Sequence, residues 1–178
     1  MNKIVKACLV TFLLASGCQD DEGIKFEGII ARGLNNEPLG TIGSNDLNDW
    51  QNEGELSAEV MKLLDFDLDL DLTGTSVSSV QMAAYPNPVS NSFRLDFGSI
   101  QNSVIRIVIV NESMKVLFRE SFVGIYSIEF DMRDPKKFPN NEIVRIYYSF
   151  SALDNPNYYI GHGDVLICRT SKCRGFNI

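Results

Sequence analysis

The sequence predicts a mainly β protein, an antiparallel β-sandwich preceded by an irregular and partly helical segment. Apolar and polar residues alternate in 92–97 and again in 144–150, as expected for strands with one buried face. Residues 104–110 are rich in β-branched side chains, which favour strands. Turn-forming residues separate about seven such stretches at intervals of roughly ten to fifteen residues, a spacing typical of sandwiches.

The β-rich part is expected over residues 82–178. The predicted strands are, in order, 92–97, 104–110, 115–119, 128–132, 144–150, 158–160 and 165–168. Residues 111–113 are expected to turn the chain between the second and third strands, which makes these two a hairpin. Residues 161–164, Gly-His-Gly-Asp, predict the turn of a last hairpin, because glycine tolerates positive φ and aspartate bonds the nearby backbone.

This last turn contains His162, the only histidine of the chain. An alternative role for His162 is a base or a metal ligand paired with Asp164. Turn geometry alone accounts for the residues, so the turn is the preferred interpretation. The sequence has no Gly-x-Ser-x-Gly motif, phosphate loop or zinc spacing. Paired carboxylates for glycoside cleavage would need a cleft, which a small sandwich hardly supplies. We therefore predict that the protein is not an enzyme.

Residues 26–81 form the irregular segment. A short strand is predicted at 26–32, and a short helix is predicted to begin at Trp50. Residues 57–64 predict a second helix, with Ser57 as its N-cap. The apolar positions Val60, Leu63 and Leu64 would share one face of that helix.

Aspartates alternate with apolar residues over 64–72, which predicts a half-buried strand with one acidic face. The alternative is weak calcium binding by Asp67, Asp69 and Asp71. Residues 69–74 are similar to the first half of a calcium loop, but Val80 stands where the bidentate glutamate is needed. We predict no cofactor and no definite metal site.

The N-terminus has the features of a secretory signal: Lys3 and Lys6 precede an apolar stretch over 7–17. That stretch is shorter than the about 20 residues of a spanning helix. Residues 14–18, Leu-Ala-Ser-Gly-Cys, resemble a bacterial lipobox. The resemblance implies that Cys18 is acylated, with palmitate among its acyl chains, and becomes the N-terminus of the mature protein. The expected organisation is a signal peptide (1–17), an acidic tether (18–25), the irregular segment (26–81) and the sandwich (82–178).

The acidic run after the cysteine adds a second resemblance. Gln19, Asp20, Asp21 and Glu22 resemble the surface-export signal of Bacteroidetes lipoproteins. This implies an outer-membrane lipoprotein that is lipid-anchored and faces the cell surface. The alternative is a solvated linker.

A third resemblance covers residues 82–150. Tyr85-Pro86-Asn87-Pro88, then Phe93-Arg94-Leu95, then residues 107–111 and 114–116 resemble the C-terminal sorting domain of the type IX secretion system. The resemblance implies an immunoglobulin-like β-sandwich. It does not carry the sorting function with it, because a lipid anchor would make that function redundant.

Composition limits the partners. Removing Lys3 and Lys6 from the 16 basic residues leaves 14 against 23 acidic ones, a net charge of −9 for the mature chain. This charge argues against nucleic acid as a partner and against docking on an anionic lipid surface.

Of the four cysteines, Cys168 and Cys173 remain available for a disulfide or a metal site. A disulfide between them suits an oxidising compartment; a zinc pair, which lacks further ligands, and two free thiols are the alternatives.

These observations predict a non-catalytic accessory or scaffold subunit of an outer-membrane protein complex. One alternative is a glycan-binding module, which would show a row of exposed tyrosines. The candidates are Tyr126, Tyr147, Tyr148, Tyr158 and Tyr159. The other alternative is type IX secretion cargo with a sorting-type C-terminal domain.

Overall fold

The computed structural model describes residues 23–44, 46–67, 75–76, 82–97, 103–152, 157–173 and 176–177. The predictions for the signal peptide, for Cys18 and for Gln19, Asp20, Asp21 and Glu22 lie outside these residues, as do Asp69 and Asp71.

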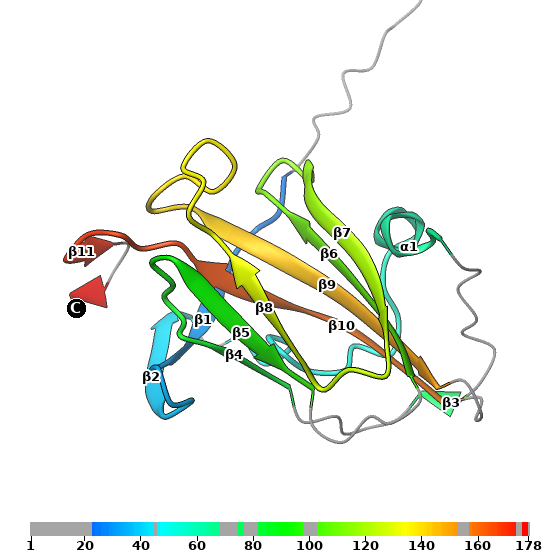
Figure 1. The fold of residues 1–178 in the computed structure, drawn as a ribbon. Helices are drawn as coiled ribbons and strands as arrows, with labels where there is room; N and C mark the ends of the chain where they lie inside the picture. The colour runs from blue at the N-terminus through cyan, green and yellow to red at the C-terminus, as the bar shows by residue number, and fades with distance from the viewer. Residues whose placement is uncertain are drawn as a thin grey trace, which may run out of the picture.

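Two sheets face each other (Figure 1). The larger sheet has the order β3 (Thr75–Ser76), β10 (Asn157–Leu166), β9 (Ile143–Ala152), β6 (Ser103–Val110), β7 (Val116–Val123). The smaller sheet has the order β4 (Ala83–Tyr85), β5 (Ser92–Asp96), β8 (Ser127–Asp131). Neighbouring strands are antiparallel except for the short β10–β3 pair. The prediction of a mainly β, antiparallel sandwich is confirmed.

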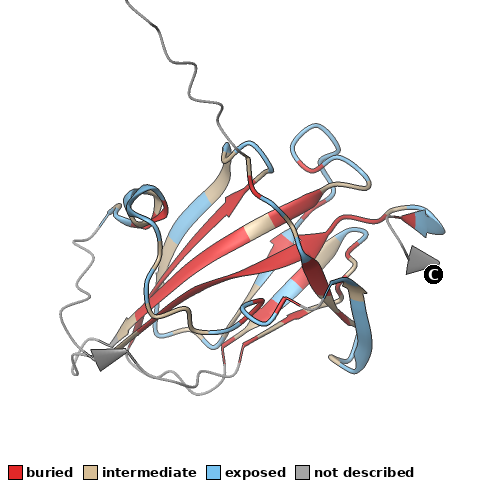
Figure 2. Ribbon diagram, turned by 180° about the vertical axis from the view of Figure 1, so that it is seen from behind, coloured by how far each residue is buried: buried red, intermediate tan, exposed pale blue. Residues whose placement is uncertain are grey.

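Two small hairpins flank the sandwich. One joins β1 (Gly28–Arg32) to β2 (Pro38–Gly43), which confirms the strand predicted near residue 30. The other joins β11 (Lys172–Cys173) to β12 (Phe176–Asn177) near the C-terminus. Figure 2 shows that β2 is largely exposed while β9 and β10 are largely buried.

The main core lies between the two sheets and is rich in aromatic rings. Phe97, just after β5, meets Phe150 of β9 edge to face, with ring centroids 5.2 Å apart. Phe118 of β7 meets Phe130 of β8 in the same way at 5.3 Å. Such contacts add specific geometry to the burial of apolar area. The alternating residues Val144, Ile146, Tyr148 and Phe150 all belong to this core.

The outer face of the larger sheet is covered by helix α1 (Ala58–Leu64). Ser57 caps the helix, since its hydroxyl accepts a hydrogen bond from the Val60 amide at 3.3 Å. Val60 and Leu64 are buried against Val108 and Tyr147. The helix predicted over 57–64 is confirmed. Because α1 covers one face of β6 and the core covers the other, every residue of β6 is buried.

The acidic strand predicted over 64–72 is wrong at its start. Leu64 is the last residue of α1, and Asp65 to Asp67 are irregular, with Asp67 at a φ of +63°. A positive φ lies outside the β region that a regular strand requires. Residues 68–72 lie outside the described part of the chain.

The predicted last hairpin, with its turn at residues 161–164, is wrong. Residues 161–164 do not turn; they form the middle of a continuous strand that pairs with β9 from Tyr158 to Leu166. The glycines serve another purpose. A Cβ on Gly163 would lie 2.2 Å from the Trp50 indole, and one on Gly161 would lie 2.1 Å from the Gln51 carbonyl oxygen. They allow another segment to approach the strand closely.

Trp50 belongs to that approaching segment. The helix predicted to begin there is wrong, because Trp50 has a φ of +61° and lies in a turn. Its ring stacks on Tyr148 at 6.2 Å between centroids. Trp50 is thereby part of the main core, and the irregular segment shares this core with the sandwich.

Asn87 links three parts of the fold. It lies in the Tyr-Pro-Asn-Pro sequence, in which the bonds preceding Pro86 and Pro88 are both cis. Its fully buried amide donates to the carbonyl oxygens of Ile30 and Asp164 and accepts from the Leu166 amide. Strands β1 and β10 are therefore held together through the side chain of Asn87.

In the part of the chain that is described, no helix has the length and apolar character needed to cross a membrane.

We predict that Gly163→Ala lowers the free energy of unfolding by about 1–3 kcal/mol, because the added methyl group displaces the indole from a filled site. Urea denaturation of Gly163→Ala, Trp50→Leu and the double variant measures this. The cost should shrink when the indole is absent. An equal cost in both backgrounds would show that the Trp50 contact is not its cause.

Candidate functional site

The strongest concentration of buried charge lies on the outer face of the larger sheet, at β9 and β10. The register pairs Tyr147 with His162 and Arg145 with Asp164. Since successive side chains of a strand point to opposite faces, these four lie on one face and Ile146 and Tyr148 on the core side. Together with the carboxylates of Asp46, Asp49 and Glu53, the side chains of Arg145, His162 and Asp164 form what we call the polar cluster.

The three carboxylates come from the segment that runs along the edge of β10. The Trp50 amide donates to the His162 carbonyl oxygen at 2.8 Å, and the Glu53 amide donates to that of Ile160 at 2.9 Å. Asp49 Oδ1 accepts from the Asp164 amide at 2.8 Å, and its Oδ2 accepts from the Ile30 amide at 3.0 Å. These contacts give the backbone groups at this edge of β10 hydrogen-bond partners. An open edge strand would lack such partners.

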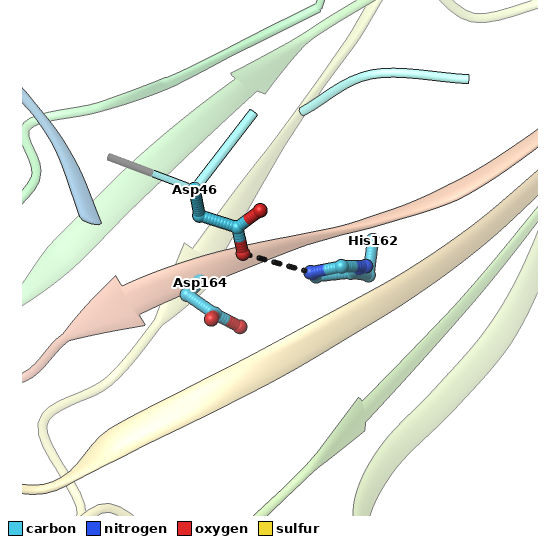
Figure 3. Close-up of side chains that lie close together, drawn as sticks. All are labelled: Asp46, His162 and Asp164. Carbon is cyan, nitrogen blue, oxygen red and sulfur yellow. Dashed lines mark ion pairs between the residues drawn. The ribbon is translucent and has the colours of Figure 1, made fainter. Parts of the chain in front are cut away.

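His162 stands between two carboxylates. Its Nδ1 lies 2.5 Å from Glu53 Oε1. Its Nε2 points toward Asp46, 3.5 Å from Oδ2 (Figure 3). This Nε2 is buried and has no hydrogen-bond partner. Only 8% of the His162 side chain is exposed, so an unsatisfied ring nitrogen at this depth is unusual.

Arg145 and Asp164 form a bidentate ion pair. Arg145 Nε donates to Oδ1 at 2.8 Å and Nη2 donates to Oδ2 at 2.7 Å. The Asp164 side chain is fully buried and that of Arg145 is 12% exposed. The guanidinium also lies over the Phe26 ring, 5.3 Å from its centroid. A fork of this geometry holds the carboxylate in one orientation.

Burial changes the proton affinities of the cluster. It raises the pKa of Asp49 to about 7, although hydrogen bonds from the Ile30 and Asp164 amides act in the other direction. Burial also raises the pKa of Asp164, and Arg145 opposes that rise. For His162, burial is the largest single influence and acts to lower the pKa, but the hydrogen bond with Glu53 and the charges of Glu53 and Asp164 together outweigh it, so the pKa is raised. Three groups with shifted pKa values in one place mark a candidate functional site.

The cluster also has the composition of a metal site. One donor atom each from Asp46, His162 and Asp164 lie within 4.8 Å of one another, and all three residues are buried. The alternative considered for His162, a metal ligand paired with Asp164, therefore has a structural basis that the turn interpretation lacked.

A second feature is a groove between β7 and β8. It has a volume of about 350 Å³. Its apolar lining comes from Phe118 and Phe122 of β7, Ile128 and Phe130 of β8, and Met132 and Phe138 beyond β8. Charged residues, Glu120, Glu129, Asp131 and Lys137, complete the lining. Among the described strands β7 pairs only with β6 and β8 only with β5, so each presents a free edge beside the groove.

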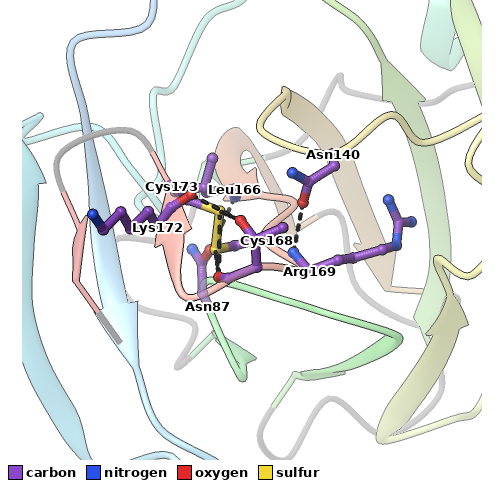
Figure 4. The surroundings of a disulfide bond; sticks show 8 residues. Asn87, Asn140, Leu166, Cys168, Arg169, Lys172 and Cys173 are labelled. Atoms are coloured by element: carbon purple, nitrogen blue, oxygen red, sulfur yellow. Dashed lines mark hydrogen bonds between the residues drawn. A yellow bond between two sulfur atoms is a disulfide. The ribbon is translucent and has the colours of Figure 1, made fainter.

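The predicted disulfide is present: Cys168 and Cys173 are bonded (Figure 4). The free-thiol and zinc-pair alternatives are thereby excluded for these two cysteines. Next to the disulfide, the Arg169 amide donates to Asn140 Oδ1, and the Arg169 guanidinium donates to the Phe138 carbonyl oxygen at 2.7 Å. These contacts hold the C-terminal segment on the loop that follows β8.

The other predicted site residues are less concentrated. Asp67 accepts a hydrogen bond from the Ser121 hydroxyl at 3.3 Å, while Asp69 and Asp71 lie outside the described residues. Of the five tyrosines considered for glycan stacking, Tyr147, Tyr148 and Tyr159 are buried and only Tyr126 is exposed, at 54%. They do not form an exposed row.

Sequence reasoning missed Asp46, Asp49, Glu53 and Arg145. The sequence held one indication of this site: Arg145 and Tyr147 occupy the non-core positions of a strand, and the following strand contains His162, the only histidine. Nothing in the sequence indicated that residues 46–53, more than 90 positions before Arg145, would cover that face. Comparison of the chain with protein-family models, with curated proteins and with solved structures finds no match.

We predict that Arg145→Met lowers the free energy of unfolding by about 3–5 kcal/mol, because it leaves the buried Asp164 charge without its partner. Arg133→Met is the matched control, since Arg133 pairs with Asp131 on the exposed surface and its loss should not measurably change stability. Chemical denaturation compares the two. Equal stability of both variants would contradict the buried ion pair.

Proposed function

We propose that this protein is a lipid-anchored, non-catalytic binding subunit at the outer membrane, and that it docks an outer-membrane β-barrel protein in the groove between β7 and β8. The groove is the observation that carries the proposal. It combines an apolar lining with two free strand edges. Contiguous apolar surface and free edges are both sites where a partner chain binds.

The position of Cys18 along the chain supports a docking site at the groove between β7 and β8. The Ile24 amide donates to the Glu112 carbonyl oxygen at 2.8 Å, in the turn between β6 and β7. Ile24 is itself buried. Cys18 precedes Gly23 by five residues, which span at most about 17 Å. A lipid on Cys18 would therefore keep the β6–β7 turn close to the membrane, with one end of β7 and its groove within reach of a membrane protein.

Two observations favour this proposal over its alternatives. The tyrosines expected of a glycan-binding module are mostly buried. Cleavage of a sorting-type C-terminal domain is also disfavoured, because Trp50, Ile24 and α1 pack on the sandwich. Removal of residues 82–178 would take away the core against which residues 24–64 fold.

We predict that Cys18→Ser moves the protein from the membrane fraction to the soluble fraction and abolishes incorporation of labelled palmitate, because several acyl chains on one residue provide the anchor. Cys8→Ser, inside the signal, should leave both properties unchanged. Membrane retention of Cys18→Ser would contradict the lipid anchor.

We also predict the position of the partner. A photo-crosslinking amino acid placed at Glu120, in the groove, should form a stoichiometric adduct with a barrel protein in native outer membranes. Val123 is exposed and separated from Glu120 by an odd number of positions along β7, so it points to the opposite face and serves as control. Mass spectrometry identifies the adduct. The absence of an adduct from Glu120, or equal crosslinking from both positions, would reject the groove as the docking site.

A further inference from the structure

We propose that Asp46, His162 and Asp164 bind one divalent transition-metal ion of the zinc type, with Glu53 and Arg145 positioning the ligands. This site is independent of the groove and of the proposed docking function. Its role would be structural, because the ion would fasten the segment that begins at Asp46 onto β10.

The first argument is the convergence of the donor atoms. Those of Asp46, His162 and Asp164 lie within 4.8 Å of one another. Donors on a tetrahedral zinc ion are about 3.4 Å apart, given bonds of about 2.0–2.2 Å. The donor atoms therefore need to approach one another by at most about 1.4 Å to surround an ion. Three protein ligands leave a fourth position for water, a common arrangement for zinc.

The second argument is the orientation of the imidazole. The contact between His162 Nδ1 and Glu53 places a proton on Nδ1, because a carboxylate can only accept. Nε2 faces Asp46 and has no hydrogen-bond partner. The raised pKa of His162 favours a proton on Nε2 in the metal-free chain, and a metal ion would release that proton and bind the lone pair of Nε2. Metal-binding histidines are commonly held in this way by a carboxylate on the other nitrogen. Glu53 is a positioning residue of this kind.

The third argument is charge. Asp46 and Glu53 lie against His162, and Arg145 is the permanent cation that pairs with Asp164. A divalent ion would balance these three carboxylates and one guanidinium. Asp49 lies beside these groups but is not a ligand, since its two oxygens accept hydrogen bonds from the Ile30 and Asp164 amides. Asp164 keeps acceptor capacity beside Arg145, because each carboxylate oxygen has two lone pairs.

The donor set selects the class of ion. Calcium and magnesium prefer oxygen ligands alone. Imidazole together with carboxylates suits zinc and similar transition metals. An ion can approach from solvent past the loop that carries Asp46, because Ser44, Leu47 and Asn48 in that loop are exposed.

The test follows the single histidine by nuclear magnetic resonance. The full chain, without a histidine tag and labelled with ¹⁵N, is titrated with Zn²⁺ after treatment with a chelator. His162 is the only histidine, so its two ring nitrogens are assigned without ambiguity. We expect saturation at one ion per chain, a shift of the Nε2 resonance and retention of the proton on Nδ1. Ca²⁺ at the same concentrations should leave the ring unchanged.

Two variants complete the design. Asp46→Asn replaces a buried carboxylate ligand by an amide of the same size and should weaken zinc binding at least tenfold, as measured by calorimetry. Glu59→Gln removes one acidic charge from the first turn of α1 and should bind zinc as the parent does. An unchanged Nε2 resonance on saturation with Zn²⁺, or equal affinity of Asp46→Asn and the parent, would overturn the proposal. The first of these results would leave His162 as a metal-free partner of Glu53 and Asp46.

Discussion

The segment over residues 46–53 lies against β10 because Gly161 and Gly163 leave no side chain in its way. The indole of Trp50 occupies the space over Gly163 and stacks on Tyr148 in the main core. On the other face of the strand, the same segment presents Asp46 and Glu53 to His162. One close approach of two backbones thus joins the irregular segment to the sandwich and assembles the polar cluster.

This arrangement explains why charge is tolerated at such depth. Asp164 is fully buried, but Arg145 satisfies both of its oxygens, and Asp49 is held by two backbone amides. Burying a charge is costly unless it is paired and hydrogen-bonded. The Nε2 of His162 is the exception, because it is buried without a hydrogen-bond partner, and the proposed metal ion would supply one. The polar cluster lies at β9 and β10 and the groove lies between β7 and β8. Binding of the proposed metal ion and binding of the proposed partner protein would therefore occur at separate sites.

Local patterns predicted much of the fold. The β-branched run at 104–110 became β6, the alternation at 144–150 became part of β9, and Ser57 caps α1. These succeed because propensity, alternation and capping act over a few residues. The prediction failed at Gly161 and Gly163, since a glycine that permits a turn and a glycine that permits a close approach look the same in sequence. It failed at Trp50 because the position of that ring in the core depends on a strand more than 100 residues away.

By itself, the sequence predicted the fold class, several strands of the sandwich and the helix over 57–64. It also gave a disulfide between Cys168 and Cys173 as one of three options for that pair. Each depends on neighbours along the chain, where periodicity and spacing limit the outcomes. Only the tertiary structure decided that His162 lies within a strand, and that Asp46, Glu53 and Arg145 surround it. Those contacts join side chains that are distant in sequence, and their geometry arises from the packing of one segment along the edge of a sheet.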